Sequence, residues 1–326
     1  MILVLGGAGY IGSHVVKNLL NEGLEVLVVD NLSTGHLEAV DKRAGFVQAN
    51  IGDPDLLEKL FTNYPIQVVM HFAANCLVGE SVFEPLKYYE NNVGNTLVLL
   101  KAMIQHGIKK FIFSSTCATY GIPNATFIDE TCRTSPVNPY GYSKLMVEQM
   151  IQDYSKAYGL SYISFRYFNV AGADDSGQIG EDHDPETHLI PNILLHLLGK
   201  SKSIGVFGQD FATSDGTCVR DYIHVLDVAN AHLLALKNLK NNEFITKIYN
   251  LGNNQGYSVR QVIQMCERIT GKMAVVEFKD RRMGDPPCLV ASSQKIQEEL
   301  GWKAVYSLED MIRSAWNWHK QNPNGF

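Results

Sequence analysis

The sequence predicts an α/β fold: a doubly wound parallel sheet followed by a smaller C-terminal α/β lobe. Three observations predict it. Short apolar runs alternate with longer amphipathic stretches, glycines cluster directly after the first apolar run, and the alternation weakens after residue 168. Short β-branched or aromatic runs are typical of strands buried on both faces. Their regular alternation with helices favours right-handed crossovers in a parallel sheet.

Each expected strand is a short apolar run bounded by turn or polar residues. These runs are residues 2–5, 25–29, 45–48, 68–72, 110–113 and 161–165. The amphipathic stretches predict helices at residues 10–20, 54–61, 88–106 and 139–158. Loops rich in Gly, Asp and Pro follow at residues 169–185 and 208–217. We therefore expect two domains, residues 1–170 and 171–326, between which the chain can cross more than once.

The charge and composition exclude several classes of protein. The 326 residues include 28 basic and 34 acidic ones, a net charge of −6. A nucleic-acid-binding protein needs a basic surface to release counterions, so no nucleic-acid partner is expected. No apolar run approaches the ~20 residues of a membrane span, and no basic region precedes the first one as in a signal peptide. The six cysteines lack zinc-site spacing and are expected to be free thiols. The sequence thus predicts a cytoplasmic protein without membrane contact.

A glycine-rich loop lies between the first expected strand and the first helix. Gly6, Gly9 and Gly12 have the spacing G-x-x-G-x-x-G. Glycine allows the tight turn and lets backbone N–H groups approach a pyrophosphate, whose charge the helix N-terminus favours. Such triplets occur by chance, so the position after a strand at the start of a helix decides the interpretation. The loop therefore predicts a Rossmann dinucleotide-binding site.

Asp30 ends the second expected strand, 18 residues after Gly12. A carboxylate there can accept hydrogen bonds from the adenosine ribose hydroxyls and would repel a 2′-phosphate. The next three residues include no basic side chain. These features favour NAD over NADP. The alternative is that Asp30 only caps a turn.

Tyr140 and Lys144 are four residues apart in the helix expected at residues 139–158, so both side chains would lie on one face. A nearby ammonium would lower the tyrosine pKa toward neutrality and make Tyr140 a general base for a sugar hydroxyl. Thr116, with Ser114 and Ser115, ends the fifth expected strand. Hydroxyls there point toward a ligand, so Thr116 could relay a proton. The alternatives are an ordinary surface Tyr/Lys pair and a threonine that caps the next segment.

From residue 2 to about residue 322, the chain resembles the UDP-glucose 4-epimerases of the extended short-chain dehydrogenase/reductase family. The Tyr/Lys pair is common to the whole superfamily, whereas later motifs are more specific to the epimerases. Beside the glycine loop, Asp30-Asn31 and the Tyr/Lys pair, the matching motifs are residues 71–74, 78–81, 114–116, 166–169, 180–182, 220–225 and 281–285.

The resemblance implies interconversion of UDP-glucose and UDP-galactose, in galactose metabolism, by transient oxidation at sugar C4 with bound NAD. Tyr140 would remove and return the proton of the 4-hydroxyl. Lys144 would bond the nicotinamide ribose, and Thr116 stands at the family's catalytic Ser/Thr position. The resemblance also implies a homodimer that pairs the helices at residues 88–106 and 139–158.

The resemblance further implies the residues of both binding sites. Those for NAD are Gly6, Gly9, Tyr10, Ile11, Gly12, Asp30, Asn31, Asn50, Ile51, Phe72, Ala73, Ala74, Asn92, Ser114, Tyr140, Lys144 and Tyr167. Those for the UDP-sugar are Thr116, Asn169, His188, Leu189, Phe207, Arg220, Arg282, Asp285 and Leu289. The arginines suit phosphate geometry, and their alternative is a surface salt bridge.

Three positions depart from the family pattern. Asn50 replaces an aspartate that often meets the adenine amine, and its oxygen can accept the same bond. Cys76 stands where some members carry a lysine near the cofactor phosphates. Leu289 stands at the position that tunes sugar size and is intermediate between a large tyrosine and a small residue. Activity on UDP-N-acetylglucosamine and UDP-N-acetylgalactosamine is therefore open.

Other activities fit less well. A nucleotide-sugar 4,6-dehydratase needs an acid pair after the strand-end threonine, where this chain has Cys117 and Ala118. A UDP-glucuronate epimerase or decarboxylase needs a carboxylate anchor, which we do not identify. A non-catalytic NAD-sensing regulator usually lacks the Tyr/Lys pair, which is retained here. The neighbouring residues 182–184, Asp-His-Asp, suggest a metal, but a solvated loop without metal is the better prediction.

Overall fold

The computed structural model describes residues 1–125, 127–282 and 284–326. The chain divides into two compact units. Unit 1 comprises Met1–Gly121, Thr134–Tyr167 and Ala229–Tyr249, and unit 2 comprises Ile122–Arg133, Phe168–Val228 and Asn250–Phe326. The main division falls at residue 168. In addition, one segment before it belongs to unit 2 and one segment after it belongs to unit 1.

A seven-stranded sheet forms the centre of unit 1, with the strand order β10-β6-β5-β4-β1-β2-β3. The strands are β1 (Ile2–Leu5), β2 (Val26–Asp30), β3 (Gly45–Gln48), β4 (Val68–His71), β5 (Lys110–Thr116), β6 (Ser161–Tyr167) and β10 (Thr246–Leu251). The pairs from β3 across to β6 are parallel. Strand β4 is in the middle of the sheet, and β1 lies between β4 and β2. The predicted doubly wound parallel sheet is confirmed.

Strand β6 extends beyond its predicted end. It stays paired with β5 up to Tyr167, which lies opposite Thr116, rather than ending at residue 165. Ser114, Ser115 and Thr116 end β5, where the sequence placed them, and all three are buried. Strand β2 begins and ends one residue later than the predicted 25–29, and β4 ends one residue before the predicted 68–72.

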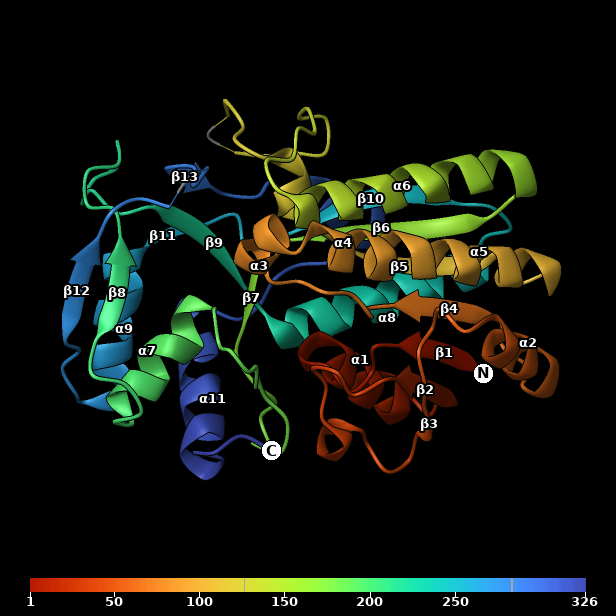
Figure 1. The fold of residues 1–326 in the computed structure, drawn as a ribbon, viewed down its shortest axis with the longest axis horizontal. Coiled ribbons are helices and arrows are strands. Elements are labelled where there is room, and N and C mark those ends of the chain that lie inside the picture. Colours follow the sequence, from red (N-terminus) through yellow and green to blue (C-terminus); the bar gives the residue numbers. More distant parts are fainter. Residues whose placement is uncertain (126, 283) are drawn as a thin grey trace. The chain divides into compact units, whose positions relative to one another are not determined.

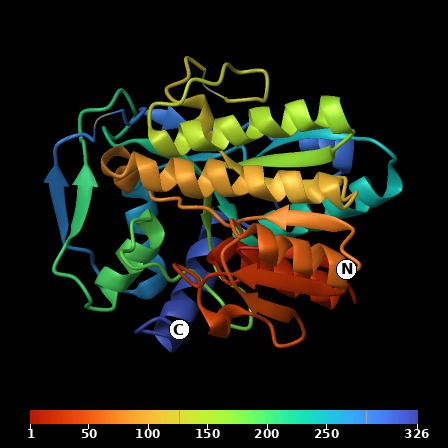
Figure 2. The ribbon, with the colours of Figure 1, turned by 45° about the vertical axis from the view of Figure 1, so that its right-hand side comes forward.

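Helices cover both faces of the seven-stranded sheet. Helices α2 (Pro54–Asn63), α5 (Asn95–Gln105) and α6 (Pro139–Tyr158) bury leucines and other apolar side chains against one face, and α1 (Tyr10–Asn21) packs beside β1 and β2. Figures 1 and 2 both show α5 and α6 side by side. The bounds of α6 match the prediction, because Asn138 caps its first turn and Gly159 ends it in a left-handed conformation.

The helix predicted at residues 88–106 is interrupted. Helix α4 (Pro85–Tyr88) is followed by a π-helical turn, η2 (Tyr89–Gly94), and only then by α5. The wider turn directs the buried Asn92 toward the backbone of Asn75 and the hydroxyl of Ser143 on α6. Such turns occur often at functional sites, and an apolar pattern does not reveal them.

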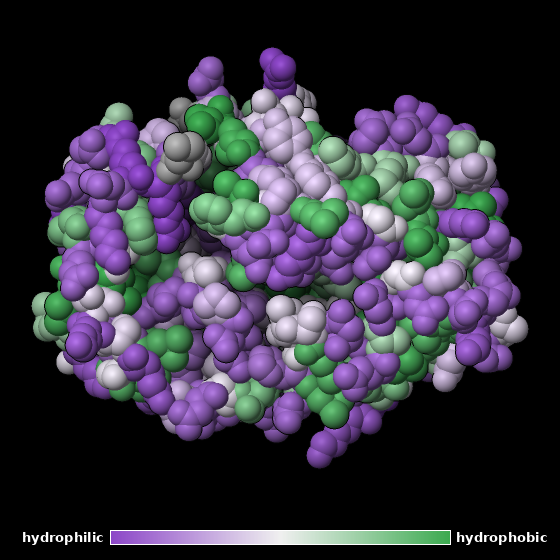
Figure 3. All heavy atoms as spheres, in the orientation of Figure 1, coloured by the Kyte–Doolittle hydropathy of each residue, from purple (hydrophilic) through white to green (hydrophobic). Residues whose placement is uncertain are grey.

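Exposed apolar side chains lie on the outer helices of unit 1. They include Phe83 on α3 (Val78–Phe83), Leu86 on α4, Leu97 on α5 and Met146 on α6. In the space-filling view, hydrophobic side chains occur among polar ones over these four helices (Figure 3). No helix in the described ranges is long and apolar enough to cross a membrane.

Unit 2 contains two small sheets. In the first, β9 (Val219–His224) pairs in parallel with β7 (Asn169–Ala171) and β13 (Cys288–Leu289), and antiparallel with β11 (Gly256–Ser258). In the second, two parallel strands pair. They are β8 (Ile204–Phe207) and β12 (Val276–Lys279). The second unit is therefore also α/β.

A helical layer forms the core of unit 2. Helices α7 (Leu189–Leu197), α9 (Val259–Thr270) and α11 (Leu308–Gln321) pack on one another and bury one shared apolar cluster.

The remaining elements are α8 (Val225–Asn241), α10 (Gln294–Leu300) and two single turns of 3-10 helix, η1 (Leu37–Ala39) and η3 (Cys117–Tyr120). All six cysteines are free thiols, as predicted.

Candidate functional site

The glycine loop folds closely on itself and against the segment that follows β4. Gly6 has a φ of +79°, and a Cβ there would lie 2.4 Å from the backbone nitrogen of Ala73. A Cβ on Gly12 would lie 2.1 Å from the carbonyl oxygen of Gly6. A Cβ on Gly9, at the start of α1, would approach only that same oxygen, at 3.5 Å. The first and third glycines thus permit the turn, and the middle one leaves the helix N-terminus open to a ligand.

Asp30 joins the end of β2 to the glycine loop. Its carboxylate accepts hydrogen bonds from the backbone N–H groups of Ala8 at 3.0 Å and Leu32 at 2.9 Å. The turn-capping role that the sequence left open is therefore present. A carboxylate offers about four lone-pair sites, so these two bonds are compatible with a ribose hydroxyl as a further donor.

Other predicted cofactor residues take part in contacts within unit 1. The Asn50 oxygen accepts from the backbone N–H of Gly52 at 2.9 Å and from the Asn95 amide at 3.2 Å. Phe72 and Ala73 both donate a backbone hydrogen bond to Leu5 at the end of β1. These contacts bring the ends of β1 and β4 together beside the glycine loop. Whether Asn50 also meets an adenine stays a prediction.

Tyr140, Lys144 and Thr116 lie together where β5 ends and α6 begins. The buried Lys144 donates a hydrogen bond from Nζ to the carbonyl oxygen of Ser114 at 2.7 Å. The Tyr140 hydroxyl is hydrogen-bonded to Thr116. The Thr116 oxygen also accepts from the backbone N–H of Ala118 at 3.1 Å and so caps η3. The structure therefore brings the three predicted catalytic residues together.

The predicted lowering of the Tyr140 pKa by Lys144 is wrong for the chain by itself. Burial raises the pKa of Tyr140, the nearby thiol of Cys76 raises it further, and the hydrogen bond with Thr116 only partly offsets this. Burial also lowers the pKa of Lys144 to about 8, against the opposing effects of Cys76 and Glu148. The reason is that desolvation disfavours both the phenolate and the ammonium.

The buried ammonium of Lys144 gives a stability that depends on pH. At pH 7, Lys144 is protonated in the folded and the unfolded chain, so folding carries the full cost of burying the charge. Between pH 8 and the ordinary lysine value of 10.5, the unfolded chain holds more protons than the folded one. Stability therefore rises with pH in this window.

Lys144→Met removes this dependence. In the cofactor-free chain at pH 7, we expect the free energy of unfolding of the variant to exceed that of the wild type by up to about 3 kcal/mol. This difference should become smaller as the pH rises toward 10. Urea unfolding at pH 7 and pH 9.5 measures the difference, and replacing the exposed Lys101 in the same way serves as a control. If the variant and the wild type differed in free energy of unfolding by the same amount at pH 7 and pH 9.5, the prediction would be contradicted.

A buried ion-pair network that the sequence analysis missed lies one helical turn beyond Lys144. Arg166 donates to the Glu148 carboxylate through Nε at 3.0 Å and through Nη2 at 2.6 Å, and through Nη1 to the Tyr120 hydroxyl at 2.9 Å. The Ser115 hydroxyl also donates to Glu148, at 2.5 Å. The network joins β5, β6 and α6. The sequence signal for the network is Glu148, an acidic residue four positions after Lys144 and therefore on the same side of the helix.

Tyr167, at the end of β6, lies in the interior of unit 1. Its hydroxyl is 2.8 Å from Nε2 of His232. Burial raises the pKa of Tyr167, the hydrogen bond with Ser114 lowers it, and the neighbouring Tyr140 raises it. Tyr167 and Ser114 therefore lie near the catalytic residues, and their contact with a cofactor stays a prediction.

Three of the predicted substrate residues meet in unit 2. Asn169, His188 and Leu189 line one cavity of about 40 Å³, together with Tyr222. The Asn169 amide donates to the carbonyl oxygen of Asp221 at 2.9 Å, which fixes it beside β9. The predicted grouping of these residues is thus found, although the cavity by itself is much smaller than a nucleotide sugar.

Four of the other predicted substrate residues form two pairs in unit 2. Arg220 and Asp285 form an ion pair at 2.5 Å with side chains 13% and 25% exposed, so the salt bridge considered for Arg220 is present but largely shielded from solvent. The Arg282 guanidinium lies 3.9 Å from the centre of the Phe207 ring. Leu289 is opposite Arg220 in the β13–β9 pairing. Residue 283 of the same motif lies outside the described residues.

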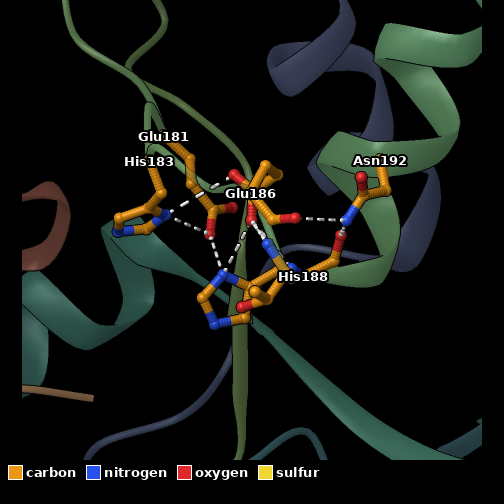
Figure 4. Close-up of polar contacts among 6 residues, drawn as sticks. Glu181, His183, Glu186, His188 and Asn192 are labelled. Carbon is orange, nitrogen blue, oxygen red and sulfur yellow. Dashed lines mark hydrogen bonds and ion pairs between the residues drawn. The ribbon is translucent and has the colours of Figure 1, made fainter. Parts of the chain in front are cut away.

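Residues 182–184 form a loop, as predicted, and Asp184 is exposed, but His183 is mostly shielded from solvent. His183 lies in a cluster with Glu181, Glu186 and His188, in which the two glutamate side chains are only 4% and 7% exposed (Figure 4). Asp182 points elsewhere and accepts a hydrogen bond from the backbone of Phe326 at 3.0 Å. Sequence spacing did not reveal the cluster, because only His183 lies within the motif considered and the other three members lie outside it.

Comparisons with known proteins agree with this arrangement. A family model described as the NAD dependent epimerase/dehydratase family matches residues 2–252. The chain is 52% identical over 326 residues to a UDP-glucose 4-epimerase of Halalkalibacterium halodurans, covering 100% of this chain and 97% of the relative. These matches extend through both units.

Two solved structures are similar along almost their whole length. The UDP-glucose 4-epimerase from Brucella ovis, in complex with NAD, is 47% identical, with a TM-score of 0.94 and 97% of each chain covered. The enzyme of the same name from Bifidobacterium longum, in complex with NAD+ and UDP, is 40% identical, with a TM-score of 0.95 and coverage of 100% and 99%. The chain therefore belongs to the NAD dependent epimerase/dehydratase family, as a full-length relative of its UDP-glucose 4-epimerases.

Proposed function

We propose that the protein interconverts UDP-glucose and UDP-galactose by transient oxidation at sugar C4 with bound NAD. The observation that carries the proposal is the meeting of Tyr140, Thr116 and Lys144 at the end of β5 and the start of α6. The full-length similarity to proteins named UDP-glucose 4-epimerase supports it.

The glycine loop and Asp30 fit the NAD cofactor. The loop is closed by backbone contacts at Gly6 and Gly12 and open at Gly9, where a pyrophosphate can approach the N-terminus of α1. Asp30 would accept hydrogen bonds from the adenosine ribose. When bound, NAD supplies the reversible two-electron oxidation of the sugar at C4.

Tyr140 would remove the proton of the sugar 4-hydroxyl and return it to the other face of the ring. Burial keeps its phenol protonated in the chain by itself, so a base role requires positive charge nearby. The Lys144 ammonium supplies one such charge, and an oxidised nicotinamide ring carries another. Thr116 would hold the Tyr140 oxygen through their hydrogen bond and keep it aimed at the substrate hydroxyl.

Residues of unit 2 would bind the UDP portion. Arg220 and Arg282 suit a diphosphate, because guanidinium groups match phosphate oxygens. Arg220 is already oriented by Asp285, which restricts its rotamers before substrate binds. Phe207, with Arg282 on its face, offers a flat surface for uracil. By the family resemblance, Asp285 would contact the uridine ribose, and Asn169 the diphosphate.

Incubating the purified protein with UDP-galactose and no added cofactor tests the proposal. We expect UDP-glucose to form, because the cofactor is regenerated in each cycle and can stay bound. Chromatography of the nucleotide sugars measures the conversion. Tight NAD binding without any turnover would instead favour the non-catalytic NAD-sensing regulator.

A parallel incubation with UDP-N-acetylgalactosamine tests the second sugar specificity. Leu289 is partly buried in β13, opposite Arg220, and its size lies between residues that exclude and admit an N-acetyl group. We expect weak activity on the N-acetylated sugar. Complete inertness toward it, with full activity on UDP-galactose, would reject dual specificity.

We also propose that the protein is a homodimer through its outer helices in unit 1. Exposed apolar side chains on α3, α4, α5 and α6 support this interface, because burying them in a partner would be favourable. Sedimentation equilibrium measures the mass directly, and the mass of a single chain would exclude the dimer. The cytoplasmic location stays a prediction from the sequence.

A further inference from the structure

We propose that Glu181, His183, Glu186 and His188 form a binding site for a divalent transition-metal ion, best suited to Zn²⁺. The sequence analysis expected no metal here and assigned only His188 a role, in substrate binding. The four side chains each direct one nitrogen or oxygen to a common point, and these atoms all lie within 4.8 Å of one another (Figure 4).

The distances between these atoms fit the size of a zinc ion's coordination shell. Tetrahedral zinc with bonds of about 2.0–2.1 Å separates its ligand atoms by about 3.3–3.4 Å. Nδ1 of His183 is 3.4 Å from Oε1 of Glu181 and 3.5 Å from Oε2 of Glu186. Nδ1 of His188 is 2.8 Å from the same Glu181 oxygen and 3.1 Å from Oε1, the other oxygen of Glu186. The four ligand atoms lie within 4.8 Å of one another, so side-chain rotations would close the shell around the ion.

The donor set selects the class of ion. Two imidazole nitrogens with two carboxylates favour zinc and its transition-metal neighbours, whereas calcium and magnesium prefer oxygen ligands alone. The two carboxylates also neutralise a divalent charge, so the bound site would be neutral and suited to burial.

Backbone contacts hold the ligands in place before α7 begins. One oxygen of Glu186 accepts from the backbone N–H groups of Thr187 and His188, each at 2.7 Å. The Asn192 amide donates to the carbonyl oxygens of Glu186 and His188 at 3.1 and 2.9 Å. His188 is 44% exposed, which leaves an entry path for the ion.

Such an ion would have a structural role in unit 2. It would link Glu181 and His183 to Glu186 and His188. The segment that precedes Leu189 would thereby be ordered. Neither the metal site nor its test depends on the proposed epimerase activity.

Metal content of the untagged, full-length protein tests the proposal. After incubation with one equivalent of Zn²⁺ and desalting, elemental analysis is expected to find about one zinc per wild-type chain. The variant His183→Gln is expected to lose most of it. The control His106→Gln removes a partly buried histidine of unit 1 that pairs with Glu58 at 2.8 Å, and it is expected to retain the zinc.

X-ray absorption spectroscopy of the zinc-loaded wild type distinguishes this site from adventitious binding at the free cysteines. We expect nitrogen and oxygen neighbours at about 2.0–2.1 Å and no sulfur at about 2.3 Å. The melting temperature should also rise with zinc in the wild type and not in His183→Gln. Sulfur scattering, or equal zinc retention in wild type and His183→Gln, would overturn the proposal. Because the spectrum needs only the wild type, it decides the matter even if the variant does not fold.

Discussion

Tyr140→Phe is expected to lower kcat for the conversion of UDP-galactose to UDP-glucose by about 10²–10⁴-fold. The substitution removes only the hydroxyl that is hydrogen-bonded to Thr116 and keeps the ring. No other group would then take the proton of the sugar 4-hydroxyl. The bound NAD is expected to remain, because the glycine loop and Asp30 are unchanged.

Tyr142→Phe is the matched control for this experiment. Tyr142 is an exposed tyrosine on the same helix, two residues along the chain. Its variant should keep kcat within about twofold, because exposed substitutions away from the site have small effects. Release of NAD by denaturation, followed by its quantification, checks that both variants still carry the cofactor. A Tyr140→Phe protein with near-normal kcat would assign the proton transfer to another group.

Arg166→Met is expected to lower the free energy of unfolding by about 3–5 kcal/mol. Arg166 and Glu148 are the partners of an ion pair at 2.6 Å, with side chains 6% and 0% exposed. Burial lowers the pKa of Arg166, but the Glu148 carboxylate raises it overall, so the pair is charged. Removing the guanidinium leaves the buried Glu148 carboxylate without its ion-pair partner. Urea unfolding at neutral pH measures the loss.

An exposed ion pair of similar length provides the comparison. Arg268 lies 2.7 Å from Glu309 on the surface of unit 2. Arg268→Met should change stability by no more than about 1 kcal/mol, because water screens such pairs. The double variant Arg166→Met/Glu148→Leu should be more stable than Arg166→Met alone, since no unpaired charge remains. Equal effects of the two arginine substitutions would contradict this account.

The parallel sheet and the pairing of Tyr140 with Lys144 on one helix could be predicted because their sequence signals are local. Residues 2–5 form a short apolar run, and Pro139 with Gly159 brackets a helix, so nearby residues alone indicate β1 and α6. Tyr140 and Lys144 face the same way because helical periodicity requires it. Gly6, with its left-handed φ, marks a turn that other residues rarely adopt.

Features that depend on distant partners could not be predicted in this way. The extension of β6 to Tyr167 depends on pairing with Thr116, about fifty residues earlier. The cluster of Glu181, His183, Glu186 and His188 depends on how the folded segment brings their ligand atoms within 4.8 Å of one another. The ladder and the cluster both form through contacts that only the folded chain supplies.

Alternation of short apolar runs with amphipathic stretches was enough to determine the α/β class, the glycine loop and the placement of Tyr140 and Lys144 on one helix face. The tertiary structure alone decided the charge state of these two residues. Burial raises the pKa of Tyr140 and lowers that of Lys144, the opposite of what their spacing suggested for the tyrosine. The physical reason is that side-chain direction follows from neighbouring residues, whereas desolvation depends on everything packed around a group.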